Sequence, residues 1–447
     1  MVDCDRADRM FSAVPGFVCV FLLAFCAVAL HAQTAPSPSS QPPALPTTER
    51  PGDVYKELTR PLDEVRSSLD NWSTPELAAL AAGIKQAQAY CGQVAPASVT
   101  DDDLYQLARV CSFGQQWNAA DAAANAYITS PSQRYKAHAY AIRVNALLNL
   151  KDTTMAVEVA RSMLHSIPYD AAVDQSMSYL IQYLAMSLDD GALPLARERQ
   201  PFLLTALESR NALKEQSGDT VIGEATLYDE GLELAFLERY AGKDIEAQRA
   251  AAALDAAIAG LPAEKLDNQA EIDRAKAQYA RLGEKLPRIE ILRYAAPGNP
   301  RPHINPDYGT ATVLLMFPEW CAQCRKMMQP LSNFLIRNNA ENIHTYGLLA
   351  LDAEETGTDP FSSDRFKDLL RTPILTTTSA TLQSFGADSF PFAVIVDGDG
   401  RIRFLGSVPA NAFDAGGYVE QFIEKNIRKS ASPNSAATAT PHGTPSS

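Results

Sequence analysis

Cysteine, positive charge and long apolar runs are all scarce in this chain of 447 residues. Its 39 basic residues are outnumbered by 53 acidic ones, and a net charge of -14 offers no basic surface to nucleic acid or to an anionic membrane. The apolar run near the start, Phe17–Leu30, is too short to span a bilayer comfortably. Seven cysteines occur, and three of them lie in or before that run.

The start of the chain has the pattern of a secretory signal. Arg6 and Arg9 precede the apolar run, and a polar stretch follows Ala32, so we predict a signal peptide over residues 1–32. Three aspartates among the first eight residues dilute the basic charge, which leaves an uncleaved membrane anchor as the alternative. Either way the rest of the protein is expected outside the cytoplasm, in the periplasm. In that oxidising compartment the four remaining cysteines should have specific roles.

Composition divides the remainder into two folded regions between two disordered ones. Residues 33–52 are rich in Pro, Ser and Thr, and residues 430–447 are similar, so both are predicted to be disordered. Residues 53–286 read as all-α throughout. Residues 287–429 alternate strand and helix patterns, which predicts an α/β domain.

The all-α region has an approximate internal period. Ser73 and Glu76 form a capping box at a helix start. Breaks at Trp117, Asp152 and Asp190 stand 35 and 38 positions apart, and small residues follow at helical spacing. The pattern resembles degenerate tetratricopeptide repeats, which implies stacked helical hairpins with a concave face for binding partners. An irregular all-α domain is the alternative.

Cys91 and Cys111 lie in this region. If their helices form an antiparallel hairpin, Cys111 lies about 14 Å along the axis from the end that faces Cys91. A disulfide needs Cα atoms within about 7 Å. Two buried, unpaired cysteines are therefore favoured over a bridge, and the bridge remains the alternative.

The chemistry of the chain concentrates after one buried strand. The apolar run Ala311–Phe317 leads to Trp320, Cys321 and Cys324, and a helix is expected over 322–337. Unpaired N–H groups and the dipole at a helix N-terminus favour negative charge, so the pKa of the Cys321 thiol should be lowered and Cys321 should react as a thiolate. Cys324, one turn on, is within reach to resolve a mixed disulfide.

A strand followed by Trp320, Cys321 and Cys324 resembles the thioredoxin superfamily. With the signal segment, the nearest resemblance is to secreted TlpA-like thiol:disulfide oxidoreductases, and it covers only the C-terminal third. A zinc site uses the same cysteine spacing but needs further soft ligands, and only His344 and His442 follow. We therefore expect no metal and no cofactor.

The resemblance implies roles for residues far along the chain. Pro391 should be cis and pack against the dithiol, and the backbone of Phe390 should pair with a strand of the substrate. Trp320 and Glu319 are expected to support the site.

One departure from the family stands in the central strand. A buried acid normally lies six residues before the first cysteine and relays protons, whereas this chain has Leu315 there. Asp352 and Glu354 are the candidates to replace it, so the relay residue stays open.

The α/β part should contain the following elements. Strands are expected over 289–293, 311–317, 343–351, 392–396 and 401–406. Helices are expected over 322–337, 363–371, 380–385 and 418–427, with a kink at Pro330 and a family insertion between the second and third of them.

These observations predict an extracytoplasmic thiol:disulfide oxidoreductase that reduces disulfides of protein substrates. Its partners would be a protein disulfide or dithiol and an upstream redox protein, with recruitment by the helical domain. No nucleic acid is expected, and membrane contact only if the signal segment is uncleaved. The alternative is a non-enzymatic interaction module with a structural disulfide in a thioredoxin fold.

Overall fold

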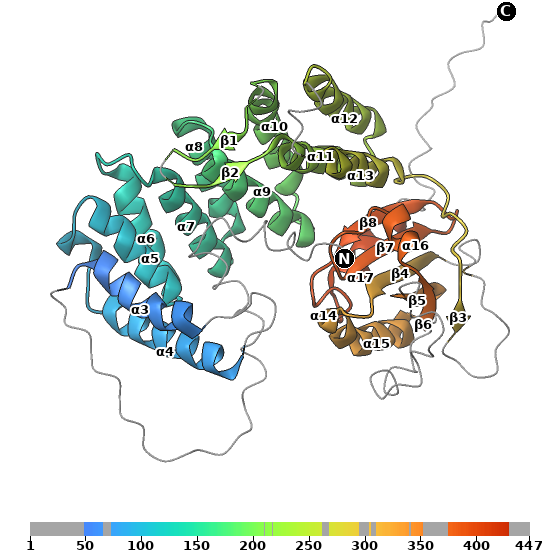
Figure 1. Cartoon of the computed structure of the whole chain (residues 1–447), viewed down its shortest axis with the longest axis horizontal. Coiled ribbons are helices and arrows are strands. Elements are labelled where there is room, and N and C mark those ends of the chain that lie inside the picture. The colour runs from blue at the N-terminus through green and yellow to red at the C-terminus, as the bar shows by residue number, and fades with distance from the viewer. Residues whose placement is uncertain are drawn as a thin grey trace, which may run out of the picture. The chain divides into compact units, whose positions relative to one another are not determined.

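A computed structural model describes most of the chain from Glu49 to Arg428. The described residues are 49–65, 73–209, 211–216, 218–261, 268–294, 304, 310–338, 341–351 and 374–428. The predicted signal peptide, nearly all of the linker, the helix at 363–371 and the C-terminal tail lie outside them. Many helices and one α/β region make up the described chain, in agreement with the predicted fold class (Figure 1).

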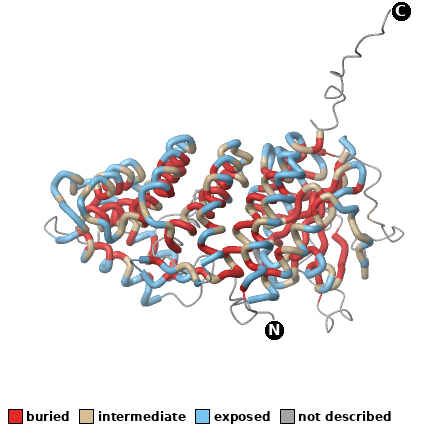
Figure 2. The backbone as a smooth tube through the Cα atoms, turned by 90° about the horizontal axis from the view of Figure 1, so that it is seen from above, coloured by how far each residue is buried: buried red, intermediate tan, exposed pale blue. Residues whose placement is uncertain are grey.

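The chain forms two compact units. The first contains residues up to Leu184 together with Pro194–Leu227, and the second contains Ala185–Leu193 together with all residues from Tyr228 onward. Figure 2 shows buried residues where neighbouring helices face one another and along the strands of the sheet. None of the described helices combines the length and the hydrophobicity that a membrane span requires.

The first unit is built mainly from helices, and the first six of them pack on their neighbours in the sequence. They are α3 Pro51–Val65, α4 Thr74–Cys91, α5 Asp102–Phe113, α6 Trp117–Thr129, α7 Lys136–Asn149, α8 Thr153–Ser166, α9 Ala171–Met186 and α10 Ala192–Glu208. The short hairpin β1 Leu213–Lys214 and β2 Val221–Ile222 follows. The capping box is present: Glu76 N–H donates to the Ser73 hydroxyl, and Ser73 N–H donates to the Glu76 carboxylate. Fully buried alanines on α6 and α8 let adjacent helices approach closely.

The preference for unpaired Cys91 and Cys111 is wrong, because a disulfide joins them with Cα atoms 5.3 Å apart. Ten residues, 92–101, separate the two helices, so α5 does not start beside Cys91. Instead its last turn packs on the last turn of α4. Gly114 makes this possible, since a Cβ there would lie 2.8 Å from the Gln88 amide nitrogen. The predicted burial of both cysteines is correct, at 6% and 1% exposure.

The second unit contains a mixed six-stranded sheet of order β3-β6-β5-β4-β7-β8. Its strands are β3 Arg293–Tyr294, β4 Ala311–Pro318, β5 Ile343–Leu351, β6 Ile374–Thr378, β7 Phe392–Asp397 and β8 Ile402–Ser407. Strand β4 lies near the centre, parallel to β5 and antiparallel to β7. The helices are α11 Glu224–Tyr240, α12 Asp244–Ile258, α13 Gln269–Ala280, α14 Ala322–Lys326, α15 Met328–Asn338, α16 Ser379–Ser384 and α17 Tyr418–Ile423, which continues as a π-turn over Glu424–Arg428.

Both faces of the sheet are covered, which explains why β4 is apolar on both sides. Val313, Leu315 and Phe317 pack with residues of α15 and α17 in one core. Leu314 and Met316 point to the other core, which includes residues of α16 and is flanked by aromatic side chains of α11 and α13. Helices α11 and α13, from the region predicted to be all-α, therefore share a core with the sheet.

Several expected elements differ from the structure. The helix expected over 322–337 is split at Met327, because Pro330 has no N–H to donate to the carbonyl of Lys326. The segment predicted to be an insertion contains β6, whose apolar and β-branched residues pair in parallel with β5. The strand expected over 289–293 is reduced to the two residues of β3. The other four strands lie within one residue of their predicted bounds.

Candidate active site

The dithiol lies at the turn that joins β4 to α14. Strand β4 ends at Pro318, Glu319 and Trp320 form the turn, and Cys321 is the N-cap residue of α14. A disulfide joins Cys321 to Cys324. Cys321 is 5% exposed and Cys324 is fully buried, so Cys321 is the sulfur that another molecule reaches first.

The sulfur of Cys321 accepts a hydrogen bond from the backbone N–H of Cys324, with 3.1 Å between the two atoms. This bond strengthens when the sulfur carries negative charge, so it favours the thiolate over the thiol. Helix α14 is only five residues long. The nearby N–H group therefore stabilises the sulfur more than the macrodipole that the sequence led us to expect.

Arg325 makes a hydrogen bond to the turn that precedes the dithiol in the sequence. Its Nη1 donates to the carbonyl oxygen of Glu319 over 2.7 Å, and the side chain is half-buried. Lys326, the other cation that follows the dithiol, is exposed. Among the described contacts of the site, Glu319 therefore acts through its backbone carbonyl, which accepts the hydrogen bond from Arg325.

Strand β7 brings a second loop to the dithiol. The register places Phe392 beside Met316 of β4, so the residues just before β7 lie next to the turn that carries Cys321. The Phe390–Pro391 peptide bond is cis, as expected, and Pro391 is buried. The Pro391 carbonyl accepts a hydrogen bond from the N–H of Val408 over 3.1 Å.

Two aromatic rings connect these loops. The rings of Trp320 and Phe390 meet edge to face, with centroids 5.8 Å apart. Trp320 is 63% exposed. The Phe390 backbone makes no hydrogen bond to another described residue. The structure thus brings Trp320, Cys321, Cys324, Phe390 and Pro391 together, while their roles stay predictions.

The surroundings of Cys324 are apolar. Leu315 is fully buried in the same core cluster as Cys324, and no carboxylate occupies its position. Asp352 and Glu354, the suggested replacements, lie outside the described residues. Among the residues that are described, no group of three or more His, Cys, Asp or Glu side chains could hold a metal ion.

Sequence reasoning missed the contacts that hold the loop before Pro391. Asp388, two residues before Phe390, lies 3.2 Å from Nε of Arg274 on α13. In the sequence, the only indication of this contact was an acidic residue so close to the expected cis-proline. Its partner is 114 positions away and could not be identified without the fold.

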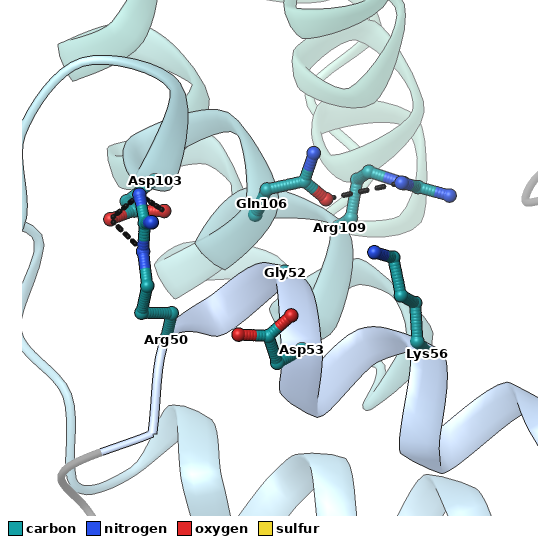
Figure 3. Close-up of a pocket in the computed structure, with 7 residues that line it drawn as sticks. All are labelled: Arg50, Gly52, Asp53, Lys56, Asp103, Gln106 and Arg109. Carbon is teal, nitrogen blue, oxygen red and sulfur yellow. Dashed lines mark hydrogen bonds and ion pairs between the residues drawn. The ribbon is translucent and has the colours of Figure 1, made fainter.

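A separate pocket lies in the first unit between α3 and α5 (Figure 3). Three cations and two carboxylates line it, together with Gly52 and Gln106: Arg50, Lys56, Arg109, Asp53 and Asp103. Arg50 is paired with Asp103, and Arg109 donates to Gln106. Its charges are largely balanced within the pocket, and it contains no group of the dithiol site.

No protein-family model and no curated protein matches the chain. Among solved structures, a thiol:disulfide interchange protein from a Bacteroides species is 16% identical, with a TM-score of 0.25, covering 33% of this chain and 90% of that one. The thioredoxin domain of a thiol-disulfide oxidoreductase from Bacteroides vulgatus is 17% identical, with a TM-score of 0.24, covering 31% and 99%. StoA from Bacillus subtilis is 15% identical, with a TM-score of 0.24, covering 32% and 98%. Similarity at this level carries no argument about activity, which must rest on the geometry of the site.

Proposed function

We propose that this chain is an extracytoplasmic thiol:disulfide oxidoreductase that reduces disulfides in protein substrates. The proposal rests chiefly on one observation: the more accessible sulfur, that of Cys321, accepts the N–H of Cys324 and lies beside an exposed aromatic residue. A purely structural disulfide has no need of a hydrogen bond that favours the thiolate.

The reaction starts from the reduced pair. The Cys321 thiolate attacks one sulfur of the substrate disulfide, the substrate S–S bond breaks, and the released substrate thiolate takes up a proton. Cys324 then loses its proton and attacks Sγ of Cys321. The second substrate sulfur leaves as a thiolate and is protonated. Two electrons have passed to the substrate, the Cys321–Cys324 disulfide has formed, and an upstream dithiol must reduce it again.

Substrate recognition would use the two loops around the dithiol. A segment of the substrate would lie along Phe390 and pair with its backbone N–H and C=O, while Trp320 contacts apolar side chains. The helices of the first unit would recruit the substrate or the upstream reductant. The N-terminal segment would direct the protein to the periplasm.

A second candidate is a binding module whose disulfide is structural. The observation that favours it is the apolar surrounding of Cys324, where the buried Leu315 leaves no carboxylate to accept the proton. In the enzymatic proposal a water molecule, or a residue outside the described ones, would take this proton.

The two candidates differ in a trapping experiment with insulin as the substrate disulfide. Reduced Cys324→Ser protein should form a mixed disulfide with insulin that persists on a non-reducing gel, because the resolving sulfur is missing. The matched Cys321→Ser variant should form none. Equal trapping by both variants, or by neither, would contradict the proposed mechanism and favour the binding module.

A further inference from the structure

The loop before the cis-proline makes hydrogen bonds and an ion pair with residues that precede the sheet in the sequence. Helix α13 lies in the same compact unit as the sheet. Its Arg274 points at residues 386–388, and Arg281, just after the helix, donates to the carbonyl of Ser384 over 3.2 Å. The loop that carries Phe390 and Pro391 therefore begins at a contact with α13.

Arg274 joins three structural elements through one guanidinium group. Its Nη2 donates to Asp229 of α11 over 2.9 Å, and its Nε lies 3.2 Å from a carboxylate oxygen of Asp388. Its Nη1 also donates to the carbonyl of Gly386 over 3.4 Å. The side chain is 17% exposed, so these interactions are partly shielded from water.

The backbone confirms how closely helix and loop approach. Gly386 has a φ of +70°, and a Cβ there would lie 2.9 Å from the Cβ of Gln278 on α13. Only a glycine fits this combination of left-handed backbone and close contact. Helix α13 thus holds the loop both by close packing at Gly386 and by the charge of Arg274.

We propose that Arg274 is a positioning residue, which holds the loop of residues 386–391 in a fixed position relative to the dithiol. Asp388 is two residues from Phe390, whose ring contacts Trp320 beside Cys321. Loss of the guanidinium leaves Asp229 and Asp388 without their shared cation and releases the Gly386 carbonyl. The loop then samples positions in which Phe390 no longer presents its backbone to a substrate.

The inference builds on the proposed function, because it assigns Arg274 to the binding of protein substrates and not to the chemistry of the sulfurs. An Arg274→Gln variant should raise KM for insulin reduction about three- to tenfold and leave kcat nearly unchanged. The equilibrium of the dithiol with glutathione should not change. The matched control is Arg249→Gln on α12, since Arg249 is exposed and makes no ion pair among the described residues.

Hydrogen exchange at backbone amides measures how firmly the loop is held, and this measurement does not depend on enzymatic activity. The amides of Ala387 and Val408 donate to Leu382 and Pro391, so both report on the loop. Both should exchange about tenfold faster in Arg274→Gln than in wild type or Arg249→Gln. If Arg274→Gln does not fold, Asp388→Asn keeps the pair between Arg274 and Asp229 and should give the same two effects.

The outcomes separate this inference from the proposed function. Unchanged exchange at Ala387 and Val408, or faster exchange with an unchanged KM, overturns the role of Arg274. A wild-type protein that never reduces insulin overturns the oxidoreductase proposal instead, and the exchange experiment still decides whether Arg274 holds the loop.

Discussion

The ring of Trp320 meets the ring of Phe390 edge to face, with ring planes at 84° and centroids 5.8 Å apart. The first residue precedes the dithiol and the second precedes the cis-proline, so this contact joins the two loops of the candidate site. Trp320 is nevertheless 63% exposed. An exposed tryptophan in this place adds little to folding and offers apolar surface to a partner.

Replacement of Trp320 by Ala should therefore affect substrate binding more than stability. An aromatic contact between Trp320 and a side chain of the substrate would contribute about 0.5–1.5 kcal/mol, and its loss corresponds to a rise in KM of about two- to tenfold. Insulin reduction and thermal unfolding of the same samples measure both effects. Trp320→Phe is the control and should retain most of the affinity; a large loss of stability with unchanged KM would contradict the assignment.

Reduced Cys321 should be alkylated at a pH well below the ordinary cysteine pKa of about 8.5. The reason is the hydrogen bond from the N–H of Cys324, which favours the thiolate. Cys324 is fully buried and should react far more slowly. Iodoacetamide labelling across pH, followed by peptide mass spectrometry, measures both sites; faster labelling of Cys324 would contradict the account.

The disulfide between Cys91 and Cys111 should stabilise the first unit. It closes a loop with a sequence separation of 20. In the chain-entropy model such a loop contributes about 3 kcal/mol to the free energy of unfolding. Urea unfolding of the Cys91→Ala/Cys111→Ala variant should show this loss, whereas insulin reduction below the unfolding midpoint should persist. Free thiols at both positions in the unreduced wild-type protein would show that the bridge is absent.

Stability should fall at alkaline pH. Burial, and then the neighbouring Tyr240, raise the pKa of Tyr418 well above its ordinary value of 10.0. In the unfolded chain Tyr418 loses its proton near pH 10, whereas the folded protein retains it, so stability is lost as pH rises above about 10. Urea midpoints measured across this range should fall more steeply for wild type than for Tyr418→Phe. Ionisation of Tyr418 near pH 10 in the folded protein would contradict this.

Much of the α/β region could be predicted because its strands are buried runs of apolar residues. Strand β5 has the predicted bounds, and the cis peptide bond before Pro391 followed from the resemblance. Strand β6 was missed because the segment was interpreted as a family insertion, although its isoleucine and three threonines are β-branched residues that favour a strand. Pro330 was expected to kink a helix, whereas the helix is interrupted at Met327, three residues before it.

Contacts between distant elements were beyond prediction. The bridge from Cys91 to Cys111 depends on how closely α4 and α5 pack at Gly114, and helical spacing alone does not determine that distance. The ion pair between Arg274 and Asp388 joins a helix to a loop that are far apart in the sequence. Both depend on tertiary packing and not on local preference.

The reduction potential of the Cys321–Cys324 pair distinguishes a protein-disulfide reductase from an oxidant and from a structural disulfide. It would be measured by equilibration of the full chain with defined ratios of reduced and oxidised dithiothreitol, followed by mass spectrometry of the dithiol peptide. Peptide-level detection separates this pair from Cys91 and Cys111. We expect a value near that of thioredoxin, about -270 mV. A value near about -120 mV would indicate an oxidant, and a disulfide that stays oxidised well below about -300 mV would be structural. Either result would contradict the proposal of a protein-disulfide reductase.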